Sequence, residues 1–152
     1  MSKGWNNDSH GLLFKSSELK LYRPSHTYGM KLSQLWRQEG VLRIMTYSLP
    51  NVDYVEMQLG RRPYNIKLLA HCKFRNKAVA IRAAFPDIEI RITEGMHSKI
   101  IGIEPRTLYI GSANFGSSGW HETMIGVRSK EAHDYFVAHL WQSEWDAAVE
   151  VA

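Results

Sequence analysis

β-Branched and other apolar residues gather in three short runs in the middle of the chain. The runs are 41–49 (VLRIMTYSL), 65–70 (NIKLLA) and 87–93 (DIEIRIT). The first two are typical of largely buried strands. In the third, isoleucines alternate with polar or charged residues, which places the isoleucines on one face of a strand. The pattern therefore predicts three β-strands.

Helical segments are predicted between these runs. Asn51 is placed to cap a helix that ends near Leu59, and Asn76 is placed to cap a helix over Lys77–Phe85, which Pro86 ends. The order strand, helix, strand, helix, strand is the signature of βαβ units. We therefore expect parallel strands at the centre of the fold.

The pattern changes after Gly95. Strands are predicted without intervening helices at 96–103, 107–110 and 123–128. A last helix is predicted over 131–149, where an apolar stripe formed by Phe136, Leu140 and Trp141 suits it to cover one face of the sheet. Together these elements predict an α/β fold, with a mixed, largely parallel β-sheet flanked by helices on both faces.

The N-terminal part is the least regular. Residues 12–14 and 18–22 are short apolar pieces that fit a hairpin or two edge strands. We interpret residues 1–30 as an N-terminal arm or edge strands and residues 31–152 as a single domain. The single cysteine, Cys72, excludes a disulfide within the chain.

Charge and hydropathy narrow the classes of partner. The 152 residues are 44% hydrophobic and carry a formal charge of +4, which favours an anionic partner, with nucleic acid ahead of a membrane surface. A generally basic, solvated surface is the alternative. The first eleven residues are polar, and no apolar run approaches the roughly 18 residues of a membrane span. We expect a cytoplasmic protein with no membrane span.

The residues best suited to chemistry lie between Gly95 and Gly126. His97 and Lys99 are two apart on a predicted strand, so their side chains should share one face. The strand at 107–110 runs into Gly111-Ser112-Ala113-Asn114, a turn rich in hydrogen-bonding groups. An imidazole and a fixed cation beside such a turn are suited to handling a phosphate.

The spacing His97-x-Lys99-x4-Glu104-x6-Gly111-Ser112-x-Asn114 resembles the HKD signature of the phospholipase D superfamily, with Glu104 in place of the usual aspartate. The resemblance extends from about residue 41 onward. It implies that His97 is a nucleophile that forms a phosphohistidine, and that no metal or cofactor takes part. It also implies that Lys99, Ser112 and Asn114 bind the phosphate, that Glu122 orients the histidine, and that Glu104 and Gly111 support the motif.

One motif provides one histidine, whereas this chemistry needs a second to protonate the leaving oxygen. His71-Cys72-Lys73 is not a second copy, because Ala78 stands at the acid position and no Gly-Ser-x-Asn follows. Short members of the family pair two identical subunits. The resemblance therefore implies a homodimer with the active site at the two-fold interface.

Further basic and aromatic residues are candidate contacts to a substrate backbone. They are Arg61, Arg62, Lys73, Arg75 and, for base stacking, Trp120. Solvated surface charge, or packing between subunits for Trp120, is the alternative. We expect a metal-independent phosphodiesterase, specifically a nuclease on DNA or, as the less favoured substrate, RNA. A phospholipase or phosphatidyl transferase, and a nucleic-acid-binding protein with little catalysis, remain alternatives.

Overall fold

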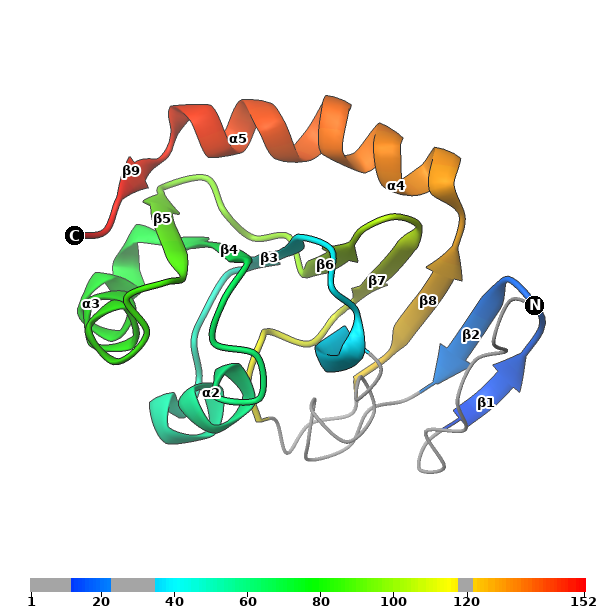
Figure 1. Ribbon diagram of the computed structural model, residues 1–152, viewed down its shortest axis with the longest axis horizontal. Coiled ribbons are helices and arrows are strands. Elements are labelled where there is room, and N and C mark those ends of the chain that lie inside the picture. Colours follow the sequence, from blue (N-terminus) through cyan, green and yellow to red (C-terminus); the bar gives the residue numbers. More distant parts are fainter. Residues whose placement is uncertain (1–11, 23–34, 118–121) are drawn as a thin grey trace.

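A computed structural model describes residues 12–22, 35–117 and 122–152, and one mixed sheet runs through these ranges (Figure 1). Its strands are β1 (Leu12–Lys15), β2 (Leu19–Tyr22), β3 (Leu42–Thr46), β4 (Ile66–His71), β5 (Glu89–Thr93), β6 (Ile100–Ile103), β7 (Thr107–Gly111), β8 (Met124–Arg128) and β9 (Val149–Glu150). Their order across the sheet is β1-β2-β8-β7-β6-β3-β4-β5-β9.

Helices cover both faces of this sheet, as predicted. They are the 3-10 helices η1 (Leu35–Arg37) and η2 (Cys72–Phe74), the α-helices α2 (Val52–Leu59), α3 (Arg75–Ala84), α4 (Lys130–Phe136) and α5 (Gln142–Ala147), and the π-helix η3 (Val137–Trp141). Figure 1 shows α4 and α5 as parts of one long rod on one side of the sheet, with α2 and α3 on the other side. None of the helices in the described ranges has the length and apolar character needed to cross a membrane.

The expectation of a largely parallel sheet is wrong. Among the described strands, only β3–β4 and β4–β5 pair in parallel, and the other six pairings are antiparallel. The residues between β6 and β7 are only Glu104–Arg106, too few for the crossover that a parallel connection requires. The α/β class and the mixed character of the sheet are confirmed.

Alternating side chains divide the core between the two faces of the sheet. On β3 and β4, Ile44 and Leu68 pack with the α2 and α3 side, whereas their neighbours Met45 and Leu69 pack with the C-terminal helices. Gly102 on β6 allows one of these helices to approach closely, because an added Cβ would lie 2.7 Å from the Phe136 ring. The sheet is therefore buried on both faces at its centre.

Several local predictions are confirmed and others need correction. Residues 12–22 form the predicted antiparallel hairpin, and the Asn51 side chain caps α2 by accepting a hydrogen bond from the Tyr54 amide. Asn76 does not cap α3, because η2 comes first and α3 begins at Arg75, two residues before the predicted start at Lys77. The predicted helix over 131–149 begins at Lys130 and ends at Ala147, and the chain then adds β9 to the sheet.

The C-terminal rod contains a π-helical turn that the sequence pattern did not predict. A π-helix has a wider turn than an α-helix, so residues five apart share a face. Phe136 and Trp141 are both buried against the sheet across this turn, and Trp141 stacks on Trp145 with ring centroids 5.1 Å apart. Leu140, which the α-helical pattern placed on the buried stripe, is exposed instead.

Candidate active site

The sheet topology brings the motif residues other than Glu104 to one edge of the sheet. Because β6 runs antiparallel to β3, the start of β6 meets the carboxyl end of β3, with Met45 paired to Ile100. Ile100 in turn pairs with Ile110, near the carboxyl end of β7, and Gly111 pairs with Met124 at the start of β8. The segments before β6, after β7 and before β8 therefore converge beside the ends of the parallel strands, the usual position of a site in such sheets.

His97 and Lys99 form the centre of this group, although they lie just before β6 rather than within a strand. The Lys99 Nζ atom lies 3.1 Å from His97 Nδ1 and 3.5 Å from Nε2, and it donates a hydrogen bond of 2.7 Å to the His97 carbonyl oxygen. His97 is exposed. The imidazole and the cation lie close together, as predicted. The cause differs from the predicted one, because the Lys99 side chain folds back onto the backbone of His97 and the two residues are not part of a strand.

Glu122 and Ser112 lie beside this pair. The Ser112 hydroxyl donates a hydrogen bond to the Glu122 carboxylate and accepts one of 3.0 Å from the Thr123 amide. Burial lowers the pKa of the Lys99 amine, and the charge of the Glu122 carboxylate opposes that shift. Lys99 is thus a cation with a carboxylate close by, next to an exposed imidazole.

Asn114 connects the motif to the end of β3. Its Oδ1 atom accepts hydrogen bonds from the amides of Tyr47 and Ser48, each of 3.1 Å, and lies 3.4 Å from the Thr46 hydroxyl. The side-chain oxygen therefore holds the loop after β3. The amide NH₂ group of an asparagine is the part that can donate to a phosphate oxygen.

Gly111 is required by the close approach of β8. An added Cβ at this position would lie 2.3 Å from the Thr123 carbonyl oxygen, a distance that only backbone displacement could relieve. A glycine at the end of β7 therefore lets the strand before Ser112 lie directly against the segment that carries Glu122.

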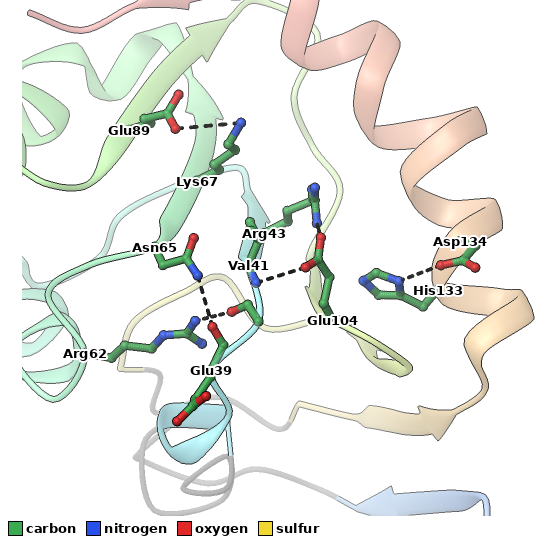
Figure 2. Close-up of polar contacts among 11 residues, drawn as sticks. Glu39, Val41, Arg43, Arg62, Asn65, Lys67, Glu89, Glu104, His133 and Asp134 are labelled. Carbon is green, nitrogen blue, oxygen red and sulfur yellow. Dashed lines mark hydrogen bonds and ion pairs between the residues drawn. The ribbon is translucent and has the colours of Figure 1, made fainter.

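Glu104 lies at the opposite end of β6 from His97 and Lys99. Figure 2 shows its carboxylate between Arg43, at 3.0 Å, and the Val41 amide, at 3.4 Å. Burial raises the pKa of Glu104, but the hydrogen bonds from Arg43 and Val41 outweigh burial and hold the pKa below its ordinary value. Glu104 thus fastens the β6–β7 turn to β3, and it touches none of the phosphate-handling candidates.

Two of the predicted substrate contacts are far from this edge. Arg62 is buried, with 1% of its surface exposed, and it donates a hydrogen bond to the carbonyl oxygen of Gly40, near the amino end of β3 (Figure 2). Its position corrects the prediction of a surface contact, because the α2–β4 connection carries it to the opposite end of the sheet. Arg61 is exposed but belongs to the same connection.

The other predicted substrate contacts are Lys73, Arg75 and Trp120. Lys73 is exposed in η2, and Arg75 is exposed at the start of α3. Both directly follow the carboxyl end of β4, so they lie at the same edge of the sheet as His97. Trp120 lies outside the described residues. In the part of the chain that the structure describes, no group of three or more His, Cys, Asp or Glu side chains is placed to hold a metal ion.

Tyr47 was not predicted to belong to the site. It directly follows β3, and its ring centroid lies 5.0 Å from that of His97 and 5.1 Å from that of His71, at the end of β4. The sequence held one indication of this contact. Tyr47 and His71 both lie near the carboxyl ends of strands that were predicted to be parallel and adjacent, and such ends lie close together.

Comparison of the sequence with models of protein families and with curated proteins finds no match. Comparison of the structure does. Nuc from Salmonella typhimurium, a phospholipase D family member, superposes with a TM-score of 0.67 at 17% sequence identity, over 88% of this chain and 98% of Nuc.

The chain has the phospholipase D fold. NucT from Helicobacter pylori superposes with a TM-score of 0.66 at 14% identity, over 88% of this chain and 99% of NucT. TrmBL2, an archaeal chromatin protein whose structure shows a novel mode of DNA binding, gives a TM-score of 0.66 at 11% identity, over 90% of this chain and 54% of TrmBL2. At these identities the likeness establishes the phospholipase D fold, and function has to be inferred from the site.

Proposed function

We propose that this chain is a phosphodiesterase that cleaves the backbone of nucleic acid through a phosphohistidine intermediate, without a metal. The observation that carries the proposal is the exposed imidazole of His97 with the Lys99 ammonium 3.1 Å from its Nδ1 atom, at the strand-end edge of the sheet. A phosphodiester is an anion, so a nucleophile needs a neighbouring cation to reach the phosphorus atom. The formal charge of +4, the exposed Lys73 and Arg75 and the phospholipase D fold favour DNA or RNA as the substrate.

The reaction proceeds in two displacements. In the first, a ring nitrogen of His97 forms a bond to phosphorus while the bond to the leaving oxygen breaks, and a second histidine gives that oxygen a proton. In the second, the same histidine takes a proton from water, whose oxygen bonds to phosphorus as the P–N bond breaks. Lys99 and the Asn114 amide bind the non-bridging oxygens. Ser112 exchanges its hydrogen bond to Glu122 for one to the phosphate, which leaves Glu122 to orient the imidazole.

The second histidine comes from a second copy of the chain in this proposal. An apolar patch, formed by Ile110, Ile125, Tyr135 and Leu140, is exposed next to the site. Ile110 pairs with Ile125 across β7 and β8 and immediately precedes Gly111-Ser112, and it lines a groove of about 680 Å³ with Tyr135 and Leu140. In this proposal the patch is the surface on which the two copies meet. A two-fold axis beside the patch would bring two copies of His97 to one shared site.

Replacing Ile125 with lysine is expected to separate the two copies and to lower cleavage by about ten-fold or more, because a buried lysine in an apolar interface is unpaired. Val79 is a matched control: it is 42% exposed, against 41% for Ile125, and it lies on α3, on the other side of the sheet. Sedimentation velocity should show a dimer for the wild type and for Val79→Lys, and a monomer for Ile125→Lys. A fully active wild-type monomer would exclude the shared site.

The substrate class is tested by incubating the wild-type protein with single- and double-stranded DNA, with RNA and with phospholipid vesicles, all in EDTA. Cleavage of nucleic acid without release of lipid headgroups is expected. Headgroup release without nucleic-acid cleavage would instead favour a phospholipase or phosphatidyl transferase. Loss of all cleavage in EDTA, restored by a divalent cation, would contradict the metal-independent mechanism.

A nucleic-acid-binding protein without significant catalysis is the second candidate. The similarity to TrmBL2, a chromatin protein, is the observation that favours it. This candidate predicts that the wild type binds DNA in a gel-shift assay and cleaves none of the substrates above. DNA cleavage that depends on His97 would exclude it.

A further inference from the structure

The environment of Tyr47 suggests a role that neither the motif nor the fold comparison assigns. Its ring contacts two histidines and a phenylalanine, with centroid distances of 5.0 Å to His97, 5.1 Å to His71 and 5.3 Å to Phe74. The Lys99 Nζ atom is 5.9 Å from the centre of the same ring, within the range of a cation–π contact. Tyr47 is half-buried, whereas His97 is exposed. The ring therefore forms a wall beside the imidazole and the cation together.

The backbone of Tyr47 is fastened on both sides. Its amide donates a 3.1 Å hydrogen bond to Asn114 Oδ1, and its carbonyl oxygen accepts a 3.3 Å hydrogen bond from the His71 amide. The Asn114 oxygen also accepts from the Ser48 amide. The Gly-Ser-x-Asn turn and the end of β4 thus fix the backbone that carries the ring, and His71 and Phe74 pack against the ring itself. The ring in turn limits where the His97 imidazole can lie.

We propose that Tyr47 is a positioning residue for His97, and that the Asn114 side-chain oxygen acts on the reaction through Tyr47. This inference rests on the proposed function. In the first displacement the attacking nitrogen must lie in line with the leaving oxygen, and an exposed imidazole can rotate about two bonds. A displacement of about 1 Å at the reacting atoms can lower a rate by about 100-fold. A Tyr47 ring that prevents unproductive orientations of the His97 imidazole therefore raises kcat. The contact is made by the aromatic ring, so a phenylalanine retains it.

The test compares Tyr47→Phe, Tyr47→Leu and Tyr47→Met with the wild type in a steady-state cleavage assay in EDTA. Phe74→Leu is the matched control, because Phe74 packs against Tyr47 and has no described ring contact with His97. We expect Tyr47→Leu and Tyr47→Met to lower kcat by about ten-fold or more with KM changed by less than about two-fold. Tyr47→Phe and Phe74→Leu should stay within about three-fold of the wild type.

A second readout does not depend on activity. The resonance of the His97 ring Cε1–H, assigned by its loss in His97→Ala, should be shifted by the Tyr47 ring current in the wild type and in Tyr47→Phe. It should move toward the position of a free histidine in Tyr47→Leu. A wild type that cleaves nothing would remove the proposed function, and this resonance would still test the packing of His97 on Tyr47.

The opposite results are equally specific. Wild-type kcat in a folded Tyr47→Leu protein would overturn the inference. A loss in Tyr47→Phe as large as in Tyr47→Leu would assign the effect to the hydroxyl group instead, and an equal loss in Phe74→Leu would assign it to general loosening of the aromatic cluster. If neither Tyr47→Leu nor Tyr47→Met folds, as judged by circular dichroism, the ring serves folding and the positioning role is withdrawn.

Discussion

Replacing His97 with alanine is expected to abolish turnover while nucleic-acid binding is retained. The imidazole is the only described histidine ring in contact with Lys99, at 3.1 Å, and its loss removes the atom that would bond to phosphorus. Removal of a nucleophile from a catalytic group that acts as a unit lowers kcat by roughly 10⁴-fold or more. Cleavage in EDTA and a gel-shift titration, carried out on the same preparation, measure the two quantities separately.

Mixing the subunits shows whether the site is shared. If each dimer needs two copies of His97, random exchange of equal amounts of wild-type and His97→Ala chains leaves one quarter of the dimers with both histidines. The mixture should then have about a quarter of the activity of the same total amount of pure wild-type protein. Activity that stays at half would mean that each subunit works alone. Turnover in His97→Ala close to that of the wild type would contradict the phosphohistidine mechanism altogether.

Replacing Lys99 with methionine is expected to lower kcat by roughly 10²- to 10³-fold, because the ammonium group offsets charge that builds on the phosphate in the transition state. Methionine keeps most of the length and apolar volume of lysine and removes the charge together with its N–H donors, including the hydrogen bond to the His97 carbonyl oxygen. Lys130→Met is the control, since Lys130 is exposed at the start of α4 and pairs with Asp134. Cleavage rates of both variants at one pH check the prediction, and a Lys99→Met enzyme with wild-type kcat would contradict it.

The same lysine predicts the alkaline side of the pH profile. Burial lowers the pKa of the Lys99 amine from the ordinary 10.5, and the Glu122 carboxylate raises it. Activity requires the protonated amine, so the rate should fall as pH rises through this lowered pKa. Glu122→Gln removes the raising charge, and the alkaline limb should therefore move to lower pH. A limb that stays in place in Glu122→Gln would show that another group titrates.

The positions of the polar residues show where sequence reasoning reaches its limit. Glu104 was interpreted as motif support, and in the structure it ties the β6–β7 turn to Arg43 and Val41, away from the phosphate-handling candidates. Arg62 was a candidate substrate contact and is buried against Gly40. The two arginines of the Arg61-Arg62 pair have equal charge and adjacent positions, and only the path of the chain after α2 decides which of them is inside.

By itself, the sequence determined the features that depend on short spacings. Short runs of apolar residues predicted the central strands, Asn51 predicted the start of α2, and the spacing from His97 to Asn114 predicted an imidazole, a lysine and a hydrogen-bonding turn close together. The tertiary structure decided which strands became neighbours, and hence that most pairings are antiparallel. It also brought Tyr47 to His97 across 50 positions of the chain. Such contacts depend on which surfaces meet when the sheet assembles, and they cannot be predicted from local periodicity or from capping residues.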